Sequence, residues 1–312
     1  MTTIHTEQSL RFVQLSDPHL TSLQGVRWRQ LANKRILGYL SWKKRRRAEH
    51  RPEILAALQH DLTSVHPDHI VVTGDLTHIG LHDEFRQARR WLESLGTAEQ
   101  VTVIPGNHDS YIRTSWMQSY AHWQPYMASD TLPSASHADV TSLFPSLRVR
   151  GPVAFIGVTS ARPSAPFLAT GSVGDKQLQQ LADVLEKTAQ QGLFRVVMIH
   201  HPPVPGEEKW RKRLTDAAAF CEVIRQQGAE LILHGHSHRS VESAVAIPGA
   251  NVPVFGIPSA SAVGHKPGRT AQYFIYEVEP QDSGWMLNIT VRGFRADKNR
   301  FVFQQARSLH IA

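Results

Sequence analysis

Six short apolar runs, each followed at once by polar residues, constrain the fold of this chain more than any other feature. Each run has four or five residues of nearly continuous apolar character, which is typical of a strand buried on both faces. Strands of this kind belong to α/β folds, because helices must cover the faces of a parallel sheet. The runs cover residues 11–15, 69–73, 101–104, 153–156, 195–199 and 230–233.

Helical patterns lie between several of these runs. Residues 53–64, 84–95 and 176–189 each place apolar side chains on one side of a helix, and residues 217–227 are also helix-like. Asp175 is expected to cap the helix that begins at residue 176.

The pattern changes late in the chain. Residues 252–257, 273–278 and 285–291 are expected to be strands joined by turns, as in an antiparallel continuation of a sheet. The segment 128–146, which is rich in Ser, Ala and Pro, is expected to be a surface excursion. Together these patterns predict one α/β domain over residues 1–312, with two packed sheets and helices outside them.

Composition narrows the class of protein. The hydrophobic content of 41% and the charged content of 20% are those of a soluble globular protein, and no apolar run approaches the ~18 residues of a membrane span. Residues 1–11 do not resemble a secretory signal. The single cysteine, Cys221, can form no internal disulfide and is expected to pack within its helix. The expected compartment is therefore the cytoplasm.

Polar clusters follow five of the predicted strands, at the carboxyl ends where α/β folds bind ligands. Taken singly, each cluster has an ordinary structural interpretation as a turn or a rigid loop. Taken together, and with 18 histidines in 312 residues, they indicate a metal site. The clusters are Asp17-Pro18-His19, Gly74-Asp75, Gly106-Asn107-His108-Asp109, His200-His201-Pro202-Pro203 and Gly235-His236-Ser237-His238.

The ordered set of clusters resembles the calcineurin-like metallophosphoesterase superfamily, from Arg11 to about Glu279. The resemblance implies a four-layer αββα sandwich, in which two mixed β-sheets are flanked by helices, and a centre with two metal ions. It further implies two sets of ligands with Asp75 bridging the ions. The first set is Asp17, His19, Asp75 and His238, and the second is Asp75, Asn107, His200 and His236.

The residue types support this division. Two cations about 3.5–4 Å apart need a bridging carboxylate, and Asp75 is the only acid in its cluster. Mixed imidazole and carboxylate ligands suit two divalent transition metal ions such as Mn, Fe, Zn, Co or Ni. The expected reaction is hydrolysis of a phosphoester by attack of a metal-bridging hydroxide.

His108 is expected to face the phosphate as the catalytic histidine and not to bind metal. Many family members carry Asp or Asn three residues after the bridging aspartate, but this chain has His78 there. We expect His108 to act more as a hydrogen-bond donor to phosphate than as a strong general acid. His201 and His234 are interpreted as structural, and Asp109 as a turn or supporting residue.

The substrate is left open by the metal motifs, which monoesterases, diesterases and nucleases share. The strings Gly-Asp-Leu-Thr, Gly-Asn-His-Asp and His-His-Pro-Pro resemble the branch that contains the bacterial class III cyclic nucleotide phosphodiesterases. A phosphodiesterase that acts on a cyclic nucleotide or a similar small diester is therefore expected. A binding module that has lost catalysis is disfavoured by the complete ligand set.

The segment 27–51 accounts for the net positive charge of the chain, because it has ten Lys or Arg against one acid, while the rest of the chain sums to −2. Its apolar residues Trp28, Leu31, Ala32, Tyr39 and Trp42 fall on one side of a helical wheel, although Arg35 interrupts them and Gly38 weakens a continuous helix. The segment could pack on the domain as a solvated basic helix, or lie on an anionic membrane. Contact with nucleic acid is less favoured.

The membrane interpretation implies a different enzyme. The segment 27–51 resembles the basic, apolar entry of enzymes that cleave UDP-2,3-diacylglucosamine at membranes. The alternative is therefore a pyrophosphohydrolase acting on a lipid or nucleotide-lipid substrate, located peripherally at the inner face of the membrane.

Overall fold

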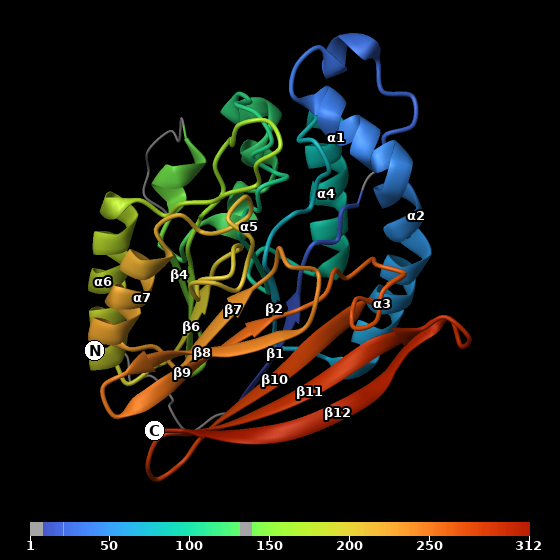
Figure 1. The fold of residues 1–312 in the computed structure, drawn as a ribbon. Coiled ribbons are helices and arrows are strands. Elements are labelled where there is room, and N and C mark those ends of the chain that lie inside the picture. The colour runs from blue at the N-terminus through green and yellow to red at the C-terminus, as the bar shows by residue number, and fades with distance from the viewer. Residues whose placement is uncertain (1–8, 21, 132–138) are drawn as a thin grey trace.

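Two six-stranded sheets pack against each other, and helices lie outside them on both sides (Figure 1). The computed structural model describes residues 9–20, 22–131 and 139–312. The four-layer sandwich expected from the sequence is therefore confirmed.

The first sheet combines three parallel strands with three antiparallel ones, in the order β12-β11-β10-β1-β2-β3. β1 pairs in parallel with β2 and antiparallel with β10, as the expected antiparallel continuation requires. β12 was not expected, because most of its side chains are exposed or half-buried and it lacks a continuous apolar run. The strands are β1 (Leu10–Leu15), β2 (His69–Val72), β3 (Val101–Val103), β10 (Gln272–Pro280), β11 (Trp285–Arg295) and β12 (Arg300–Ile311).

The second sheet has the order β4-β5-β6-β7-β9-β8, with antiparallel strands at both edges. The expectation of an antiparallel continuation is wrong for β9, which pairs in parallel with β7 and antiparallel only with β8. The edge strands β4 and β8 were not predicted, because their side chains are largely half-buried or exposed. The strands are β4 (Ser146–Arg150), β5 (Val153–Gly157), β6 (Phe194–Met198), β7 (Leu231–His234), β8 (Val241–Ile247) and β9 (Ala250–Gly256).

Four longer helices form where the sequence predicts them: α3 (Pro52–Val65), α4 (His82–Leu95), α6 (Asp175–Gln190) and α7 (Ala217–Gln227). The expected cap by Asp175 is wrong, because Asp175 is already helical and the capping position is Gly174. Asp216 instead accepts the Gly174 N–H at 2.7 Å, which fixes the entry to α6. A short helix, α5 (Gln124–Met127), lies near β3.

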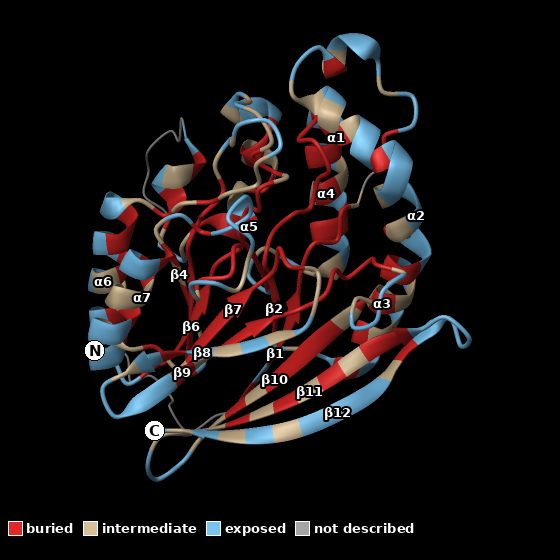
Figure 2. Cartoon of the chain, viewed as in Figure 1, coloured by how far each residue is buried: buried red, intermediate tan, exposed pale blue. Residues whose placement is uncertain are grey.

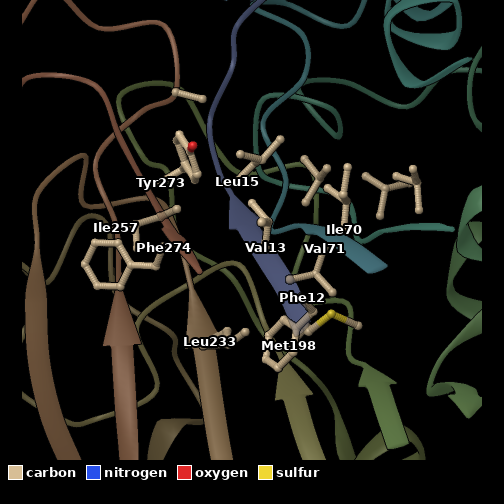
Figure 3. Packing of buried hydrophobic residues seen from close by; sticks show 14 of the residues in the cluster. Phe12, Val13, Leu15, Ile70, Val71, Met198, Leu233, Ile257, Tyr273 and Phe274 are labelled. Atoms are coloured by element: carbon tan, nitrogen blue, oxygen red, sulfur yellow. The ribbon is translucent and has the colours of Figure 1, made fainter. Parts of the chain in front are cut away.

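The main core lies between the sheets and extends under α3 and α4 (Figures 2 and 3). Phe12 of β1 makes an edge contact with Phe155 of β5, with ring centroids 5.1 Å apart, and stacks on Tyr276 of β10. A second core lies under α6 and α7. The main core fixes how the two sheets pack on each other. As a result, the carboxyl ends of the parallel strands of both sheets lie at the same edge of the sandwich.

Residues 27–51, called the basic segment below, form a series of short helical turns at the top of the view in Figure 1. The turns are a 3₁₀ turn (Trp28–Leu31), α1 (Arg35–Ser41), a π-helical turn (Trp42–Arg46) and α2 (Arg47–Glu49). Trp42 and Leu31 anchor the basic segment in a small core with Leu23, Ile79 and Leu81.

The apolar residues predicted to lie on one side of the basic segment are therefore partly buried and partly exposed. Trp42 is 3% exposed, whereas Trp28 is 74% exposed and Ala32 is also exposed. The basic segment is not one continuous helix, although α1 passes through Gly38. A Cβ at Gly38 would overlap the side chain of Ile79, so the glycine permits close packing on the domain.

The expected surface excursion at 128–146 includes residues 132–138, which lie outside the described residues. On either side of this gap, Ala128, Val140 and Phe144 are buried. No helix within the described part of the chain is both long and apolar enough to cross a membrane.

Candidate metal centre

All five polar clusters lie at one edge of the sandwich, just beyond the carboxyl ends of β1, β2, β3, β6 and β7. Their side chains converge into two groups of potential metal ligands. The two groups share one residue, Asp75.

The first group consists of Asp17, His19, Asp75 and His238. Nε2 of His238 lies 3.1 Å from Oδ1 of Asp17 and 3.4 Å from Nε2 of His19. Nε2 of His19 lies 3.9 Å from Oδ2 of Asp75. Separations of about 3–4 Å are those of neighbouring ligands around one ion with bonds of about 2.0–2.2 Å.

The second group consists of Asp75, His200 and His236, and Asn107 joins it. Nε2 of His200 lies 3.4 Å from Oδ2 of Asp75 and 3.2 Å from Oδ1 of Asn107. Nδ1 of His236 lies 2.8 Å from the same amide oxygen. All seven ligands expected from the sequence are therefore brought together, in the two expected groups.

The backbone at these residues is held in an unusual conformation. Asp17, His19, Asp75, His236 and His238 all have positive φ, between 43° and 66°, which costs free energy for residues with a Cβ. Eight described non-glycine residues have such angles, and these five account for most of them. Strain of this kind is concentrated at functional sites, where the surrounding structure stabilises it.

Gly106 shows how tightly the clusters pack. A Cβ at this position would overlap Oδ1 of Asp75, although Gly106 does not have a positive φ. The glycine therefore lets the loop after β3 approach the carboxylate that the two ligand groups share.

Hydrogen bonds from outside the groups orient their members. Nδ1 of His19 contacts the carbonyl of Thr77 at 3.0 Å, and Nδ1 of His200 contacts the carbonyl of Thr73 at 2.7 Å, which turns Nε2 of each ring toward the cluster. Asp109 accepts the backbone N–H groups of Asp75, Thr77 and Gly106 at 2.8–3.0 Å. Its role as a supporting turn residue is confirmed by these contacts.

The protonation states and the unpartnered atoms of the cluster suit the binding of a cation. Oδ1 of Asp17 is buried and accepts no hydrogen bond among the described residues, although Nε2 of His238 lies 3.1 Å from it. Desolvation lowers the pKa of His19 and His236 well below the usual value, so both imidazoles are neutral and have lone pairs free for a metal. The residues present therefore fit the divalent ions that the sequence implies.

Asp75 and His200 form a buried charge pair in the cluster, with Nε2 of His200 3.4 Å from Oδ2 of Asp75. Burial opposes ionisation of Asp75, but the neighbouring His200 and His108 more than offset it and hold the Asp75 pKa well below its usual range. Burial likewise opposes charge on His200, and the Asp75 carboxylate raises the His200 pKa to about 9. A divalent cation at this place would replace the proton of His200.

His108 stands at the rim of the cluster and takes its orientation from backbone. Its Nδ1 lies 2.6 Å from the carbonyl oxygen of His78, which assigns the ring proton to Nδ1. The imidazole of His78 stacks on that of His19, with ring centroids 5.1 Å apart.

Arg46 is a site residue that sequence reasoning missed. Its Nη1 lies 3.2 Å from Nδ1 of His108, although it is 62 residues away in the chain. Desolvation, and then the charge of Arg46, lower the pKa of His108 to about 3. Arg46 forms no ion pair with a carboxylate among the described residues, so its donors are free to bind an anion.

His50, at the end of the basic segment, was also missed. It forms a third candidate group with His19 and His238, and its Nδ1 is held by Ser261 at 2.8 Å. No sequence signal marked Arg46 or His50, because both lie in a basic segment whose path over the site follows from tertiary packing.

Two histidines and the cysteine have the structural roles expected of them. His201 contacts Ser160 Oγ at 2.7 Å and the carbonyl of Ala169 at 3.2 Å. His234 is fully buried beside Gly256. Burial raises the pKa of Cys221 to about 11, which leaves its thiol unreactive.

A cavity of about 530 Å³ opens over the ligand groups, which is large enough for a small substrate. Asp75, Asn107, His236 and His238 lie along its floor, and Arg46 lines it as well. The site can therefore hold metal ions and an anion side by side.

Sequence comparison identifies the class of protein to which this arrangement belongs. Residues 10–240 match the model of the calcineurin-like phosphoesterase family. The chain is 30% identical over 196 residues to a cAMP/cGMP dual specificity phosphodiesterase of Mycobacterium tuberculosis, a match that covers 61% of this chain and 55% of that protein. It therefore spans only about half the length of that relative. It is 28% identical to a probable cyclic nucleotide phosphodiesterase of a Synechococcus strain, over 75% of this chain and 80% of that protein.

Comparison of structures shows the same fold. A dimetal phosphatase from Danio rerio superimposes with a TM-score of 0.55 at 13% identity, over 97% of this chain and 99% of that one. The chain belongs to the calcineurin-like phosphoesterase family, whose members are metal-dependent phosphoric ester hydrolases.

Proposed function

We propose that this calcineurin-like phosphoesterase is a phosphodiesterase that works with two divalent transition metal ions. The observation that carries the proposal is the pair of ligand groups that share Asp75 at the carboxyl ends of the strands. Asp17, His19, Asp75 and His238 would hold one ion, and Asp75, Asn107, His200 and His236 the other. Bound there, the ions would activate water as the nucleophile and neutralise charge on the phosphoryl group.

The residues around the ligands support binding of a phosphodiester. Arg46 offers free guanidinium donors at the rim of the cluster, where non-bridging phosphoryl oxygens would lie. The charge of Arg46 lowers the pKa of His108, and a bound anion would offset this effect. The anion would favour the imidazolium form of His108, since an opposite charge stabilises the protonated ring. With Nδ1 held by the carbonyl of His78, Nε2 of His108 would then donate to a phosphoryl oxygen or to the leaving group.

The proposed substrate is a cyclic nucleotide or a similar small phosphodiester. The names of the two bacterial relatives support this class. The test is turnover by the metal-supplemented protein of bis-p-nitrophenyl phosphate, 2′,3′- and 3′,5′-cyclic nucleotides, and UDP-2,3-diacylglucosamine. We expect hydrolysis of the first three, and loss of hydrolysis in folded Asp75→Ala and Asn107→Ala variants. A protein that binds metal but turns over none of these compounds would contradict the proposal.

A second candidate function is supported by the exposed surface near the site. Trp28, Leu40, Phe167 and Trp210 are 54–78% exposed. Trp28 and Trp210 each lie between two basic residues in the chain, and Leu40 and Phe167 line a cavity together with Lys209 and Arg211. Exposed aromatic and aliphatic residues among Lys and Arg suit an anionic membrane surface. The corresponding enzyme is a peripheral hydrolase of a lipid or nucleotide-lipid pyrophosphate such as UDP-2,3-diacylglucosamine.

Sedimentation with vesicles separates the two candidates. The membrane candidate predicts that the protein sediments with anionic vesicles at low salt, and that a Trp28→Ser/Leu40→Ser variant does so less. Phe303→Ser is the matched control, because Phe303 is also exposed but lies on β12. Protein that stays in the supernatant at every salt concentration would exclude the membrane candidate.

A further inference from the structure

A second cavity, of about 460 Å³, opens beside the candidate metal centre between the basic segment and the loop after β6. Asn107, His108 and Arg46 line both this cavity and the one above the ligand groups. A substrate whose reacting phosphate lies at the ligand groups therefore has room for one of its substituents here. The volume is in the usual range for small-molecule sites.

The lining of this second cavity carries an unbalanced positive charge. Five cations line it, and no Asp or Glu does so within the described part of the chain: the cations are Lys34, Arg46, Lys209, Arg211 and Lys212. Glu208 lies next to Lys209 in the chain but is not part of the lining, and its carboxylate accepts a hydrogen bond from Ser237 at 2.8 Å. A cavity with this charge favours an anionic ligand.

The cations on the two sides of the cavity differ in whether they already have interaction partners. Lys34 is already engaged, since its Nζ donates to the carbonyl of Ser164 at 2.7 Å and lies over the ring of Tyr111. Across the cavity, Lys209, Arg211 and Lys212 form no ion pair among the described residues. These three lie within one turn, because the Lys212 N–H donates to the carbonyl of Lys209 at 2.7 Å.

The cavity also has an apolar wall. Leu40 of the basic segment and Phe167 of the loop after β5 line it, with 54% and 78% of their surfaces exposed. Tyr111 adds an aromatic face next to His108, with ring centroids 5.7 Å apart. Large exposed apolar side chains beside free cations suit a ligand that combines an apolar body with an anionic group.

We propose that this cavity binds the part of the substrate that carries a second anionic group beside an apolar or aromatic body. The inference rests on the proposed phosphodiesterase function and narrows the class of substrate. A 3′,5′-cyclic nucleotide has its only phosphate at the reacting position, so it would leave Lys209, Arg211 and Lys212 without a partner. A phosphodiester with an additional terminal phosphate satisfies both the reacting position and the cavity.

The experiment compares two chromogenic diesters that differ by one phosphate. They are thymidine 5′-(p-nitrophenyl phosphate) and thymidine 3′-phosphate 5′-(p-nitrophenyl phosphate). We expect the metal-supplemented wild type to favour the phosphorylated compound by about tenfold or more in kcat/KM, as one or more charge-assisted hydrogen bonds provide. In a Lys209→Gln/Arg211→Gln variant the ratio should fall toward one. Arg213→Gln is the matched control, because Arg213 is exposed in the same loop but does not line the cavity.

Binding to the metal-free protein gives an independent readout. Calorimetric titration with thymidine 3′,5′-bisphosphate should show binding that weakens about tenfold in the double variant and is unchanged in Arg213→Gln. Equal kcat/KM for the two diesters in the wild type would overturn the inference, as would equal binding of the bisphosphate by wild type and double variant. Failure to hydrolyse either diester or bis-p-nitrophenyl phosphate would instead contradict the proposed function itself.

Discussion

Arg46 allows a direct test of how the basic segment contributes to the site. The guanidinium lies 3.2 Å from Nδ1 of His108, lines the cavity over the ligand groups, and has no carboxylate partner among the described residues. The π-helical turn at Trp42–Arg46 and the burial of Trp42 fix the backbone from which the Arg46 side chain extends.

Replacement of Arg46 by Gln should weaken binding of the reacting phosphate. A charge-assisted hydrogen bond contributes about 1.5–3 kcal/mol, which corresponds to a loss of about 10- to 150-fold in kcat/KM. Arg46→Lys should recover part of this loss, because it keeps the charge without the forked donors. Added guanidinium should partly restore an Arg46→Ala variant, which a purely structural role would not permit.

The assay is the hydrolysis of bis-p-nitrophenyl phosphate with saturating Mn²⁺, together with inhibition by inorganic phosphate and the metal content of each variant. Lys43→Gln is the matched control, because it removes a charge from the same π-helical turn at an exposed position outside the cavities. The reasoning is refuted if folded, metal-loaded Arg46→Gln keeps kcat/KM and the phosphate inhibition constant within twofold of wild type.

Two further predictions concern stability. Trp42→Ala should lower the free energy of unfolding by about 3–5 kcal/mol, measured by urea denaturation, because it empties the small core under the basic segment; a loss below about 1 kcal/mol would show that the basic segment packs less firmly than described. Burial, and then Arg150 and Arg148, lower the pKa of His69 to about 3, so the unfolded chain takes up a proton near pH 6.5 while the folded chain does not. Stability should therefore fall as the pH drops below 6.5, and His69→Gln should remove roughly 2.5 kcal/mol of the loss between pH 7 and 4.5; identical pH profiles for the two proteins would contradict this assignment.

Much of the fold follows from the sequence because its central strands carry a continuous apolar signal. β2 and β6 are buried along their whole length, and the sequence shows this directly. The edge strands β4, β8 and β12 lack that signal. Most residues of β8 are exposed or half-buried, and the strand forms by pairing with β9. Such pairing depends on tertiary contacts and cannot be predicted from the local sequence pattern.

Some residues of the candidate site were likewise predicted from the sequence, and others were not. Its seven expected ligands follow strands at the sheet edge, and the resemblance of their ordered motifs to the family implied that Asp75 belongs to both groups. Arg46 and His50 reach the site only because Trp42 and Gly38 fix the path of the basic segment over the domain. Their positions depend on close packing between distant residues, which composition and helical periodicity do not encode.

The metal content of the protein, reconstituted with Mn²⁺ or Zn²⁺ and freed of excess ion, tests the central claim most directly. The arrangement of two ligand groups around Asp75 predicts two ions per chain in the wild type. It predicts about one ion in His238→Ala, which belongs only to the first group, and none held tightly in Asp75→Ala. One ion or none in the wild type, or two in a folded Asp75→Ala variant, would contradict a two-metal centre bridged by this carboxylate.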